Sequence, residues 1–522
     1  MRYRFGWLAM VVLLGCTLAA CGGKSQNNAA SGGGSPSSST NAAVQSGGTL
    51  TVAYTDGIPQ LNPVIRTFAA EEVLFPLMWS ALSKTDADGK IVPDLAKSWK
   101  ASADQRTWTF QLREANFSDG SPITAGDVVK VFRYYLDPKT ATQERNKVAT
   151  IASVKAPDDT HVVIRLKAPN AQFPAAIVWV KIIDVDNVAK LDKEPVVSGP
   201  YTVKDFVPSD HVTLVPNPSY FGEKGKLDEI RIVKASDATA GVTALRSGSV
   251  DGLWSPNPAD VASIESDPNM QIVAPDAPSK YVDWEMDTTS PPFDDVRARQ
   301  ALAYAVDREA VLKNAYYGLG DASPTNNPLS TKNPFYGGEL TDYSYDLEKA
   351  KELFAAAGIT EGSTLTWWGT AGSNPEWTTA AQILQASLKE IGITLKIQNR
   401  EVSTWADRFY PAGKKYPGLI VPNLVPFPPS PAEAVSFYLA GRCECNWDNP
   451  EFEKAYADAM AEADEQAAKE KWGKVQEIIN EQVPLIIPLQ VRPLTAMSKT
   501  VAGAWMESGG QLHLEQAGLA EG

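Results

Sequence analysis

The sequence predicts a mixed α/β protein with more than one domain. Strand-like and helix-like segments interleave along the chain, which is typical of this class. The body that begins at residue 47 is too long for one compact core, so two or three domains are expected. The apolar and charged fractions of the whole chain, 43% and 21%, are those of an ordinary globular protein.

Four short segments have the two-residue alternation of β-strands. Residues 106–112 alternate most clearly, with Trp108, Phe110 and Leu112 on one face and threonine or glutamine on the other. The other expected strands cover residues 48–54, 161–166 and 212–215.

Four later segments have the spacing of amphipathic helices. Asp346 is placed to cap a helix over residues 347–357, and Gly358 is placed to end it. The other expected helices cover residues 380–391, 452–463 and 472–479.

The first twenty residues have the pattern of a secretory signal peptide. Arg2 and Arg4 precede an apolar run of roughly a dozen residues, and small residues then lead to Cys21. The sequence LAAC resembles a bacterial lipobox, in which the cysteine becomes the lipidated first residue. We expect a signal peptide over residues 1–20 and acylation of Cys21, with an ordinary secretory signal as the alternative.

Residues 21–46 are expected to form a flexible tether behind the lipidated cysteine. They are almost entirely glycine, serine, asparagine, alanine and glutamine, and such a segment cannot bury a core. A tether of this length spans roughly 25–30 Å on average. No later segment approaches the ~18 uncharged apolar residues that a membrane helix needs, so the lipid is the only membrane attachment expected.

The charge of the chain excludes nucleic acid as a partner. Removal of residues 1–20 takes away two of the 48 basic residues, and the 46 that remain face 62 acidic residues, a net charge of −16. Binding to phosphates requires a cationic surface.

The two cysteines of the body allow a disulfide in an oxidising compartment and do not predict a metal site. Cys443 and Cys445 are separated only by Glu444, and they form either a local disulfide or two free thiols. Two thiols need further ligands to hold a metal, and the chain has only three scattered histidines. These histidines are His161, His211 and His513.

A search for catalytic motifs predicts a protein that is not an enzyme and has no cofactor. Gly-x-Ser-x-Gly, Walker-type and His-Glu-x-x-His motifs are absent from the sequence. Residues 318–323 begin like a dinucleotide loop but lack the third glycine and follow a helix, so a surface turn is expected. A triad assembled in space is the remaining enzymatic alternative.

Several longer stretches point to one protein family. Residues 95–129 contain a strand that ends in Leu112-Arg113, an Asp119-Gly120 turn and a Thr-Ala-Gly-Asp-Val helix start. Locally these residues are turn and cap signals, since Thr124 can cap a helix that begins at Ala125. Together with further matches, they resemble the large solute-binding lipoproteins of ABC importers, the family of oligopeptide- and dipeptide-binding proteins. The further matches are residues 47–50, 61–63, 198–201, 217–221, 245–251 and 292–302.

The resemblance implies a two-lobed α/β fold like that of periplasmic binding proteins, of class II and of the large type with an extra inserted subdomain. It places lobe one at residues 47–74, 170–286 and 488–522. The inserted subdomain would cover residues 75–169, and lobe two residues 287–487.

The resemblance also implies a binding function with no catalysed reaction. Such a protein captures a solute between two closing lobes on the extracytoplasmic face of the cell membrane. It then delivers the solute to ABC permease subunits that work with a cytoplasmic ATPase, and it acts as a monomer. The alternatives are a ligand-sensing receptor lipoprotein without transport and an enzyme on the same scaffold.

An oligopeptide is the favoured ligand. In peptide-binding relatives an aspartate of the second lobe holds the amino group of the peptide, but the matching stretch here, residues 422–431, contains no acid. A buried ammonium without a carboxylate would cost several kcal/mol. An oligosaccharide, which the 14 tryptophans would suit, and other solutes therefore stay open.

The resemblance and the residue types together select ten candidate cleft residues. Either of the two arginines among them could form a bidentate pair with a ligand carboxylate. We also expect Trp405→Ala to weaken ligand binding at least about tenfold while leaving the melting curve of the empty protein nearly unchanged. The ten are Phe68, Glu71, Tyr281, Trp284, Trp405, Arg408, Asn423, Phe427, Gln490 and Arg492.

Overall fold

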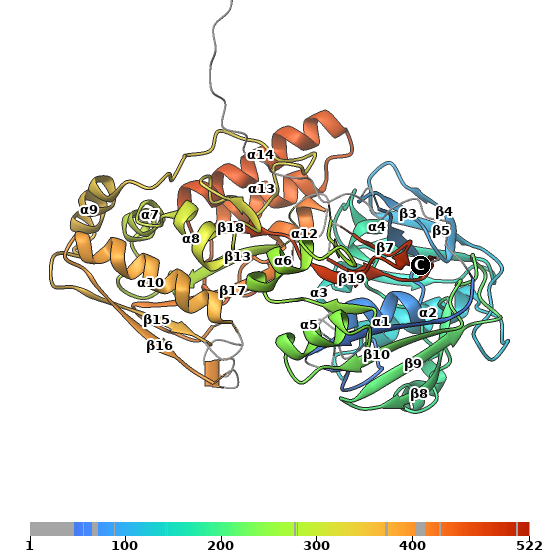
Figure 1. The fold of residues 1–522 in the computed structure, drawn as a ribbon. Helices are drawn as coiled ribbons and strands as arrows, with labels where there is room; N and C mark the ends of the chain where they lie inside the picture. The colour runs from blue at the N-terminus through green and yellow to red at the C-terminus, as the bar shows by residue number, and fades with distance from the viewer. Residues whose placement is uncertain are drawn as a thin grey trace, which may run out of the picture. The chain divides into compact units, whose positions relative to one another are not determined.

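Three larger β-sheets and three two-stranded ribbons organise the described part of the chain in the computed structural model (Figure 1). The structure describes residues 46–520, with gaps at 56, 65–70, 88, 141, 143–144, 276–277, 279, 371–373, 402–403, 406–412, 427–429 and 508–509. The expected signal peptide and tether, with Cys21, lie outside these residues apart from Ser46.

The seven-stranded sheet contains the first strand of the body. Ala53 and Leu253 on one face pack with helices α5 (Ala238–Arg246) and α6 (Pro258–Glu265), while Leu50 and Val52 enter a larger hydrophobic cluster. The strands lie in the order β12 (Met270–Val273), β19 (Thr495–Ser498), β11 (Gly252–Trp254), β1 (Thr49–Tyr54), β10 (Glu229–Lys234), β9 (His211–Pro216) and β8 (Tyr201–Val207).

The four-stranded sheet confirms the clearest strand prediction. Trp108, Phe110 and Leu112 of β5 are buried, and the threonines and glutamine between them are half-buried. Helix α2 (Ala125–Leu136) packs against this sheet, and Thr124 and Asp127 form a capping box at its start. The strands lie in the order β4 (Ala96–Ala101), β5 (Thr107–Leu112), β7 (His161–Leu166) and β6 (Ile151–Lys155).

The six-stranded sheet has hydrophobic clusters on both faces. One cluster joins Trp284 of β13 to helices α7 (Val296–Tyr304), α8 (Arg308–Ala315), α9 (Leu347–Ala356) and α10 (Pro375–Glu390). The other joins Tyr281 of the same strand to α12 (Pro431–Ser436), α13 (Pro450–Met460) and α14 (Glu465–Gln482). The strands lie in the order β14 (Gly320–Ala322), β18 (Leu485–Val491), β13 (Lys280–Met286), β17 (Leu419–Pro426), β15 (Thr364–Gly369) and β16 (Thr394–Asn399).

The helix caps expected from the sequence are present. The Asp346 side chain accepts from the backbone N–H of Lys349 at the start of α9. The structure also shows a cap at α7, where Asp295 accepts from the backbone N–H of Arg297. Helix α10 begins at Pro375, five residues before the expected start, because Pro375 suits a first helical turn. The expected turn at residues 318–323 contains the short strand β14, which pairs with β18.

The chain passes twice between the seven-stranded and six-stranded sheets. Residues 274–279 lead from β12 to β13, and residues 492–494 lead from β18 back to β19. The boundaries expected at residues 286 and 487 therefore need correction, since they separate β13 from the sheet in which it pairs and divide β18. The sheet that a strand joins depends on its pairing with distant strands, which a local sequence pattern does not contain.

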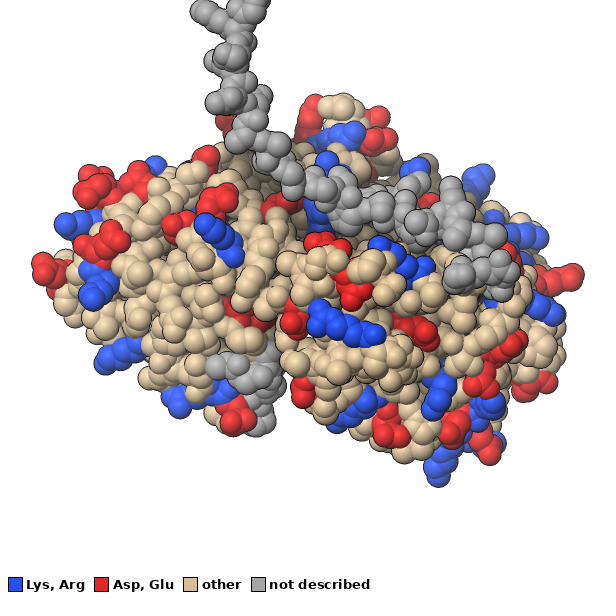
Figure 2. Space-filling view, in the orientation of Figure 1, with Lys and Arg blue, Asp and Glu red and all other residues tan. Residues whose placement is uncertain are grey.

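No helix among the residues described is long and apolar enough to cross a membrane. On the face shown in Figure 2, lysine and arginine side chains are interspersed with acidic ones. The remaining elements are α1 (Glu71–Met78), α3 (Arg145–Val148), α4 (Phe173–Ala176), the 3₁₀ helix η1 (Val185–Lys190), and the strand pairs β2 (Ser83–Thr85) with β3 (Ile91–Pro93), β20 (Val501–Ala502) with β23 (Gly518–Leu519), and β21 (Trp505–Met506) with β22 (Leu512–His513).

Candidate ligand-binding site

Strand β13 places two acidic side chains inside the protein. Its side chains alternate between the two faces of the six-stranded sheet, so Asp283 and Glu285 share the face of Tyr281, opposite Trp284. Asp283 pairs in register with Asn423 of the neighbouring strand β17. Both acids have an exposed fraction of 0%. The strand thus presents two buried carboxyl groups on one face.

A third carboxyl group, that of Glu444, completes what we call the acidic cluster: Asp283, Glu285 and Glu444. Glu444 is 9% exposed. One oxygen of Glu285 accepts a hydrogen bond of 3.3 Å from the side-chain amide of half-buried Asn423. Both oxygens of Asp283 and one oxygen each of Glu285 and Glu444 accept no hydrogen bond from any described residue.

Burial makes the ionised forms of these acids unfavourable. Burial and the nearby charge of Glu444 raise the pKa of Asp283 well above its ordinary value. Burial and the charges of Asp283 and Glu444 do the same to the pKa of Glu285. Burial raises the pKa of Glu444 to about 7. A positive charge placed among them would favour the ionised forms.

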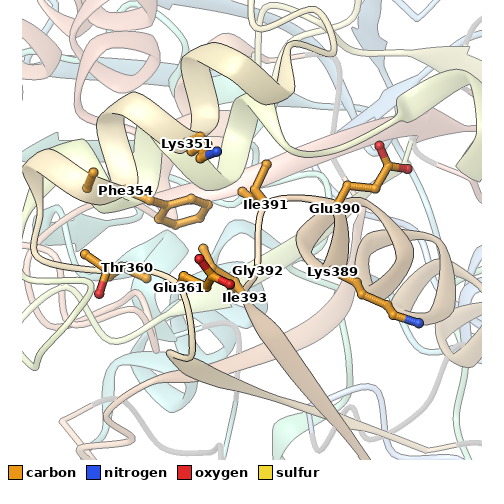
Figure 3. A pocket seen from close by; sticks show the side chains of 11 residues that line it. Lys351, Phe354, Thr360, Glu361, Lys389, Glu390, Ile391, Gly392 and Ile393 are labelled. Carbon is orange, nitrogen blue, oxygen red and sulfur yellow. The ribbon is translucent and has the colours of Figure 1, made fainter.

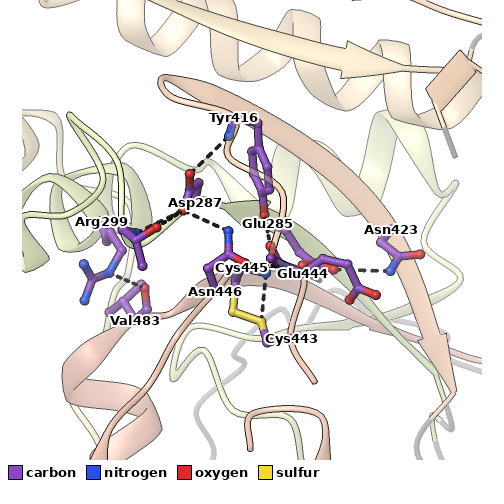
Figure 4. The surroundings of a disulfide bond; sticks show 12 residues. Glu285, Asp287, Arg299, Tyr416, Asn423, Cys443, Glu444, Cys445, Asn446 and Val483 are labelled. Atoms are coloured by element: carbon purple, nitrogen blue, oxygen red, sulfur yellow. Dashed lines mark hydrogen bonds between the residues drawn. A yellow bond between two sulfur atoms is a disulfide. The ribbon is translucent and has the colours of Figure 1, made fainter. Parts of the chain in front are cut away.

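A small disulfide loop holds Glu444 beside β13 (Figure 4). The structure joins Cys443 to Cys445, so the backbone of Glu444 closes a tight ring. The Tyr416 hydroxyl donates to the backbone carbonyl of Glu444 at 2.7 Å, and the backbone N–H of Thr288 donates to that of Cys445 at 2.9 Å. The loop is therefore tied to the end of β13 and to the segment before β17.

Asp287, one residue after β13, provides a contrast. Its carboxylate accepts from the side-chain amide of Asn446 at 3.0 Å, from the backbone N–H of Tyr416 at 3.1 Å, and from both the N–H and hydroxyl of Thr289. Although Asp287 is also buried, its carboxylate has partners on each side. We assign it a structural role.

The sulfur atoms of Cys443 and Cys445 lie within 4.8 Å of a carboxylate oxygen of Glu285. A metal would bind thiolates, and a disulfide offers none. In the oxidised state seen here, the three residues do not fit a metal site.

The structure brings together only some of the ten predicted cleft residues. Tyr281 and Gln490 are register partners on adjacent strands, and Asn423 pairs with Asp283, two residues from Tyr281 on the same strand. The side-chain amide of Gln490 donates to the backbone carbonyls of Asn327 and Leu329 at 2.9 and 2.8 Å, so it holds a loop. Arg492 is half-buried just after β18. Phe68, Arg408 and Phe427, as well as the side chain of Glu71 at the start of α1, lie outside the described residues.

Both tryptophans among the ten predicted cleft residues are core residues. Trp284 is fully buried on the opposite face from Tyr281 and packs edge-on against Trp367, with ring centroids 5.1 Å apart. Trp405 is 6% exposed and packs against Trp377 at 5.9 Å. Residue type suggested a cleft, but the packing of the sheet and helices buries both rings.

The expectation for Trp405 therefore changes. We now expect Trp405→Ala to lower the free energy of unfolding of the empty protein by about 3–5 kcal/mol, because it leaves a cavity in the core. Urea denaturation would measure the loss, with Trp368→Ala at a half-buried tryptophan as the milder control. An unchanged unfolding curve for Trp405→Ala would contradict the packing role and restore the original expectation.

The acidic cluster was missed at the sequence level. One sequence feature points to the cluster: Asp283 and Glu285 alternate within a strand that is otherwise largely apolar or aromatic. The position of Glu444 between two cysteines is a second signal. Nothing in the sequence shows that strand and loop meet.

A separate pocket lies at the ends of helices α9 and α10 (Figure 3). It has a volume of about 410 Å³ and is lined by residues such as Phe354, Glu361 and Lys389. None of the ten predicted cleft residues and no member of the acidic cluster lines it.

Comparisons of sequence identify relatives. A family model for bacterial extracellular solute-binding proteins, family 5, matches residues 90–443. Heme-binding protein A of Haemophilus influenzae is 31% identical over 350 residues, which cover 61% of this chain and 63% of that protein. The chain thus spans less than two thirds of the length of that relative. The dipeptide-binding protein of Escherichia coli is 25% identical over 503 residues, which cover 88% of this chain and 92% of that protein.

Solved structures share the fold. The periplasmic binding protein DppA from Helicobacter pylori, in complex with the peptide STSA, has a TM-score of 0.80 and 22% identity over 91% of this chain and 99% of that chain. The oligopeptide-binding protein AppA from Bacillus subtilis has a TM-score of 0.79 and 23% identity over 92% and 100%. These similarities confirm the expected α/β fold of periplasmic binding proteins. Since the family model also covers more than half of the chain, the protein belongs to the bacterial extracellular solute-binding proteins of family 5, a family of binding proteins rather than enzymes.

Proposed function

We propose that this protein is the substrate-binding component of an ABC importer and that it captures an oligopeptide. The observation that carries the proposal is the similarity to the E. coli dipeptide-binding protein over 92% of its length. The partners would be permease subunits and their cytoplasmic ATPase, and the protein would act as a monomer.

Capture would use two lobes. We propose lobe one around the seven-stranded sheet, with the four-stranded sheet as its inserted subdomain, and lobe two around the six-stranded sheet. Two connections support a hinge, because among the described strands the chain passes between the two sheets after β12 and again after β18. A ligand that binds both lobes would favour the closed state by its higher affinity for that state.

The membrane attachment is proposed from the sequence. Cys21 would carry the lipid on the extracytoplasmic face, and the residues after it would serve as the tether.

Peptide is proposed over other solutes because several relatives are named for peptides. The E. coli relative is a dipeptide-binding protein, and another, from Pseudomonas aeruginosa, is a probable di/tripeptide-binding protein that is 30% identical over 392 residues. Structures of similar fold were solved with agropinic acid and with Ni(L-His), so the fold also accommodates other solutes.

Mass spectrometry of natively purified, untagged protein without its tether tests the proposal. We expect short peptides to be released when the protein is denatured and to be absent from a sample that was unfolded, dialysed and refolded first. The refolded sample should regain them from a peptide digest. Release of a glycan or a metal chelate, or failure to rebind any peptide, would overturn the peptide assignment.

A further inference from the structure

We propose that the acidic cluster of Asp283, Glu285 and Glu444 holds a positively charged nitrogen group of the ligand, an ammonium or a guanidinium. This inference rests on the proposed binding function and specifies the chemistry of its site. It assigns a role to three residues that no packing or capping role explains.

The first argument is that the acidic cluster has no cation beside it among the described residues. No lysine, arginine or histidine among the described residues forms an ion pair with any of the three carboxyl groups, and their electrostatic neighbours are one another. Buried Asp94, in contrast, lies near the positive charges of Lys84 and Lys181. Buried acids in proteins are normally paired with a cation, so this cluster is built to receive one.

The second argument is the hydrogen bonding of Asp283. This side chain has an exposed fraction of 0%, and neither of its carboxyl oxygens accepts a hydrogen bond from a residue that the structure describes. Buried polar groups in native proteins almost always have a partner, and the exceptions call for a functional explanation. Asp287, four residues along, has the full set of donors that Asp283 lacks. The missing donors are those that an ammonium or guanidinium brings.

The third argument favours an organic cation over a hydrated metal ion. The cluster shares its face of the sheet with Tyr281, Tyr438 and Trp447, which belong to one buried cluster of aromatic and apolar side chains. Tyr281 and Tyr438 are close enough to Asp283 and Glu285 for their charges to interact. Aromatic faces and carboxylates together are a common setting for organic cations.

The fourth argument is a route to the site. Asn423 is half-buried and donates directly to Glu285, so the edge of the cluster reaches the accessible part of β17. Asn423 is also one of the residues selected for the cleft on other grounds. A ligand group that displaces or joins the Asn423 amide would meet the Glu285 carboxyl group that this amide contacts.

The test compares neutral variants with a matched control. Asp283→Asn and Glu285→Gln each replace one ionisable carboxyl group of the cluster by a neutral amide, while Asp287→Asn does the same to the neighbouring, fully hydrogen-bonded acid. Calorimetry would use lysine- and arginine-free tri- to pentapeptides with free amino termini, the same peptides N-acetylated, and the solutes arginine and putrescine. Calcium and manganese ions would serve as the metal probes.

We expect the wild type to bind at least one of the positively charged organic probes. Binding should weaken at least about tenfold in Asp283→Asn and in Glu285→Gln, and N-acetylation of a bound peptide should have an effect of similar size. Asp283→Asn should also raise the melting temperature of the empty protein, because an unpaired buried acid is removed. Asp287→Asn should lower the melting temperature and keep the affinity, a combination that a merely structural role for Asp283 would not produce.

Four results would overturn the inference. With the peptides, these are wild-type affinity in both cluster variants and equal binding of free and acetylated peptides. With the other probes, these are binding of none of the organic cations and tight binding of calcium or manganese alone. Equal binding of free and acetylated peptides would leave the peptide function standing, whereas binding of arginine or putrescine without any peptide would retain the cluster and reject the peptide. If Asp283→Asn does not fold, Glu285→Gln decides the question.

Discussion

His513→Gln is expected to lower the free energy of unfolding by about 3–5 kcal/mol at pH 7, because it takes away the cation that contacts buried Glu507 and half-buried Glu515. One ring nitrogen of His513, Nδ1, lies 2.8 Å from Glu515, and Nε2 lies 3.6 Å from Glu507. The ring also stacks on Trp505, with centroids 3.9 Å apart and planes 6° from parallel. Glutamine keeps a polar side chain but carries no charge.

The pH dependence of stability gives this prediction a second measurement. Burial by itself would lower the pKa of His513, but the charge of Glu515 and the contacts with Glu507 and Glu515 outweigh burial and raise it to about 9. The folded-state pKa thus lies above the ordinary value of 6.5, so the folded protein binds the proton more tightly. The stabilisation is complete below about pH 6.5 and is lost as the pH rises towards about 9.

Urea denaturation of wild type and His513→Gln between pH 6 and 10 would test both parts. The difference between the two proteins should shrink as the pH rises. His211→Gln is the matched control, since His211 also contacts two carboxylates, Asp205 and Asp210, at the surface. Its effect should stay within about 0.5 kcal/mol. A His513 effect as small as this, or one that does not change with pH, would contradict the buried ion pair.

Arg299→Met is expected to lower the free energy of unfolding by about 3–5 kcal/mol, because it removes the donor from two buried backbone carbonyls and one partly buried one. Arg299 lies on α7, is 4% exposed, and donates to the carbonyls of Gln482, Val483 and Phe293 at 2.7–3.1 Å. Gln482 is the last residue of α14, and Val483 has a left-handed backbone with φ of 42°. The guanidinium therefore caps the carboxyl end of the longest helix described and fixes its turn into β18.

Arg297→Met provides the control on the same helix. The Arg297 side chain is half exposed and pairs with Asp295 at 2.6 Å, and a surface pair of this kind contributes about 0–1 kcal/mol. Thermal and urea unfolding of both variants would measure the difference. Similar losses in the two variants would show that the carbonyls of α14 find other donors and that Arg299 does not act as a cap.

Local features were predictable from the sequence because they depend on near neighbours. The capping box of Thr124 and Asp127 spans three residues, and the Asp346 cap reaches the N–H of Lys349, again three residues away. The burial of Trp108 and Phe110 follows from a two-residue alternation within one strand. Motifs of this range also carried the family assignment, since they are short, ordered and specific.

The candidate site was predicted less well, for a reason that Trp284 illustrates. Its neighbours Tyr281 and Asn423 were selected together with it, yet the pleat of β13 sends Trp284 to the opposite face. The sequence of a strand does not determine which of its faces packs against helices and which one a loop joins. The acidic residues of the same strand were passed over because an isolated aspartate in a sequence is normally a surface residue.

The sequence by itself determined the α/β class, the helix caps, the clearest strands and the similarity to solute-binding proteins. The tertiary structure alone decided that β13 pairs outside the sheet of the strand before it, that Trp405 is a core residue, and that Glu444 meets Asp283 and Glu285. It also decided that Arg299 reaches the end of α14, 183 residues away. Periodicity records how a residue relates to its nearest neighbours, whereas these contacts depend on the packing of whole sheets and helices, which no short window of sequence contains.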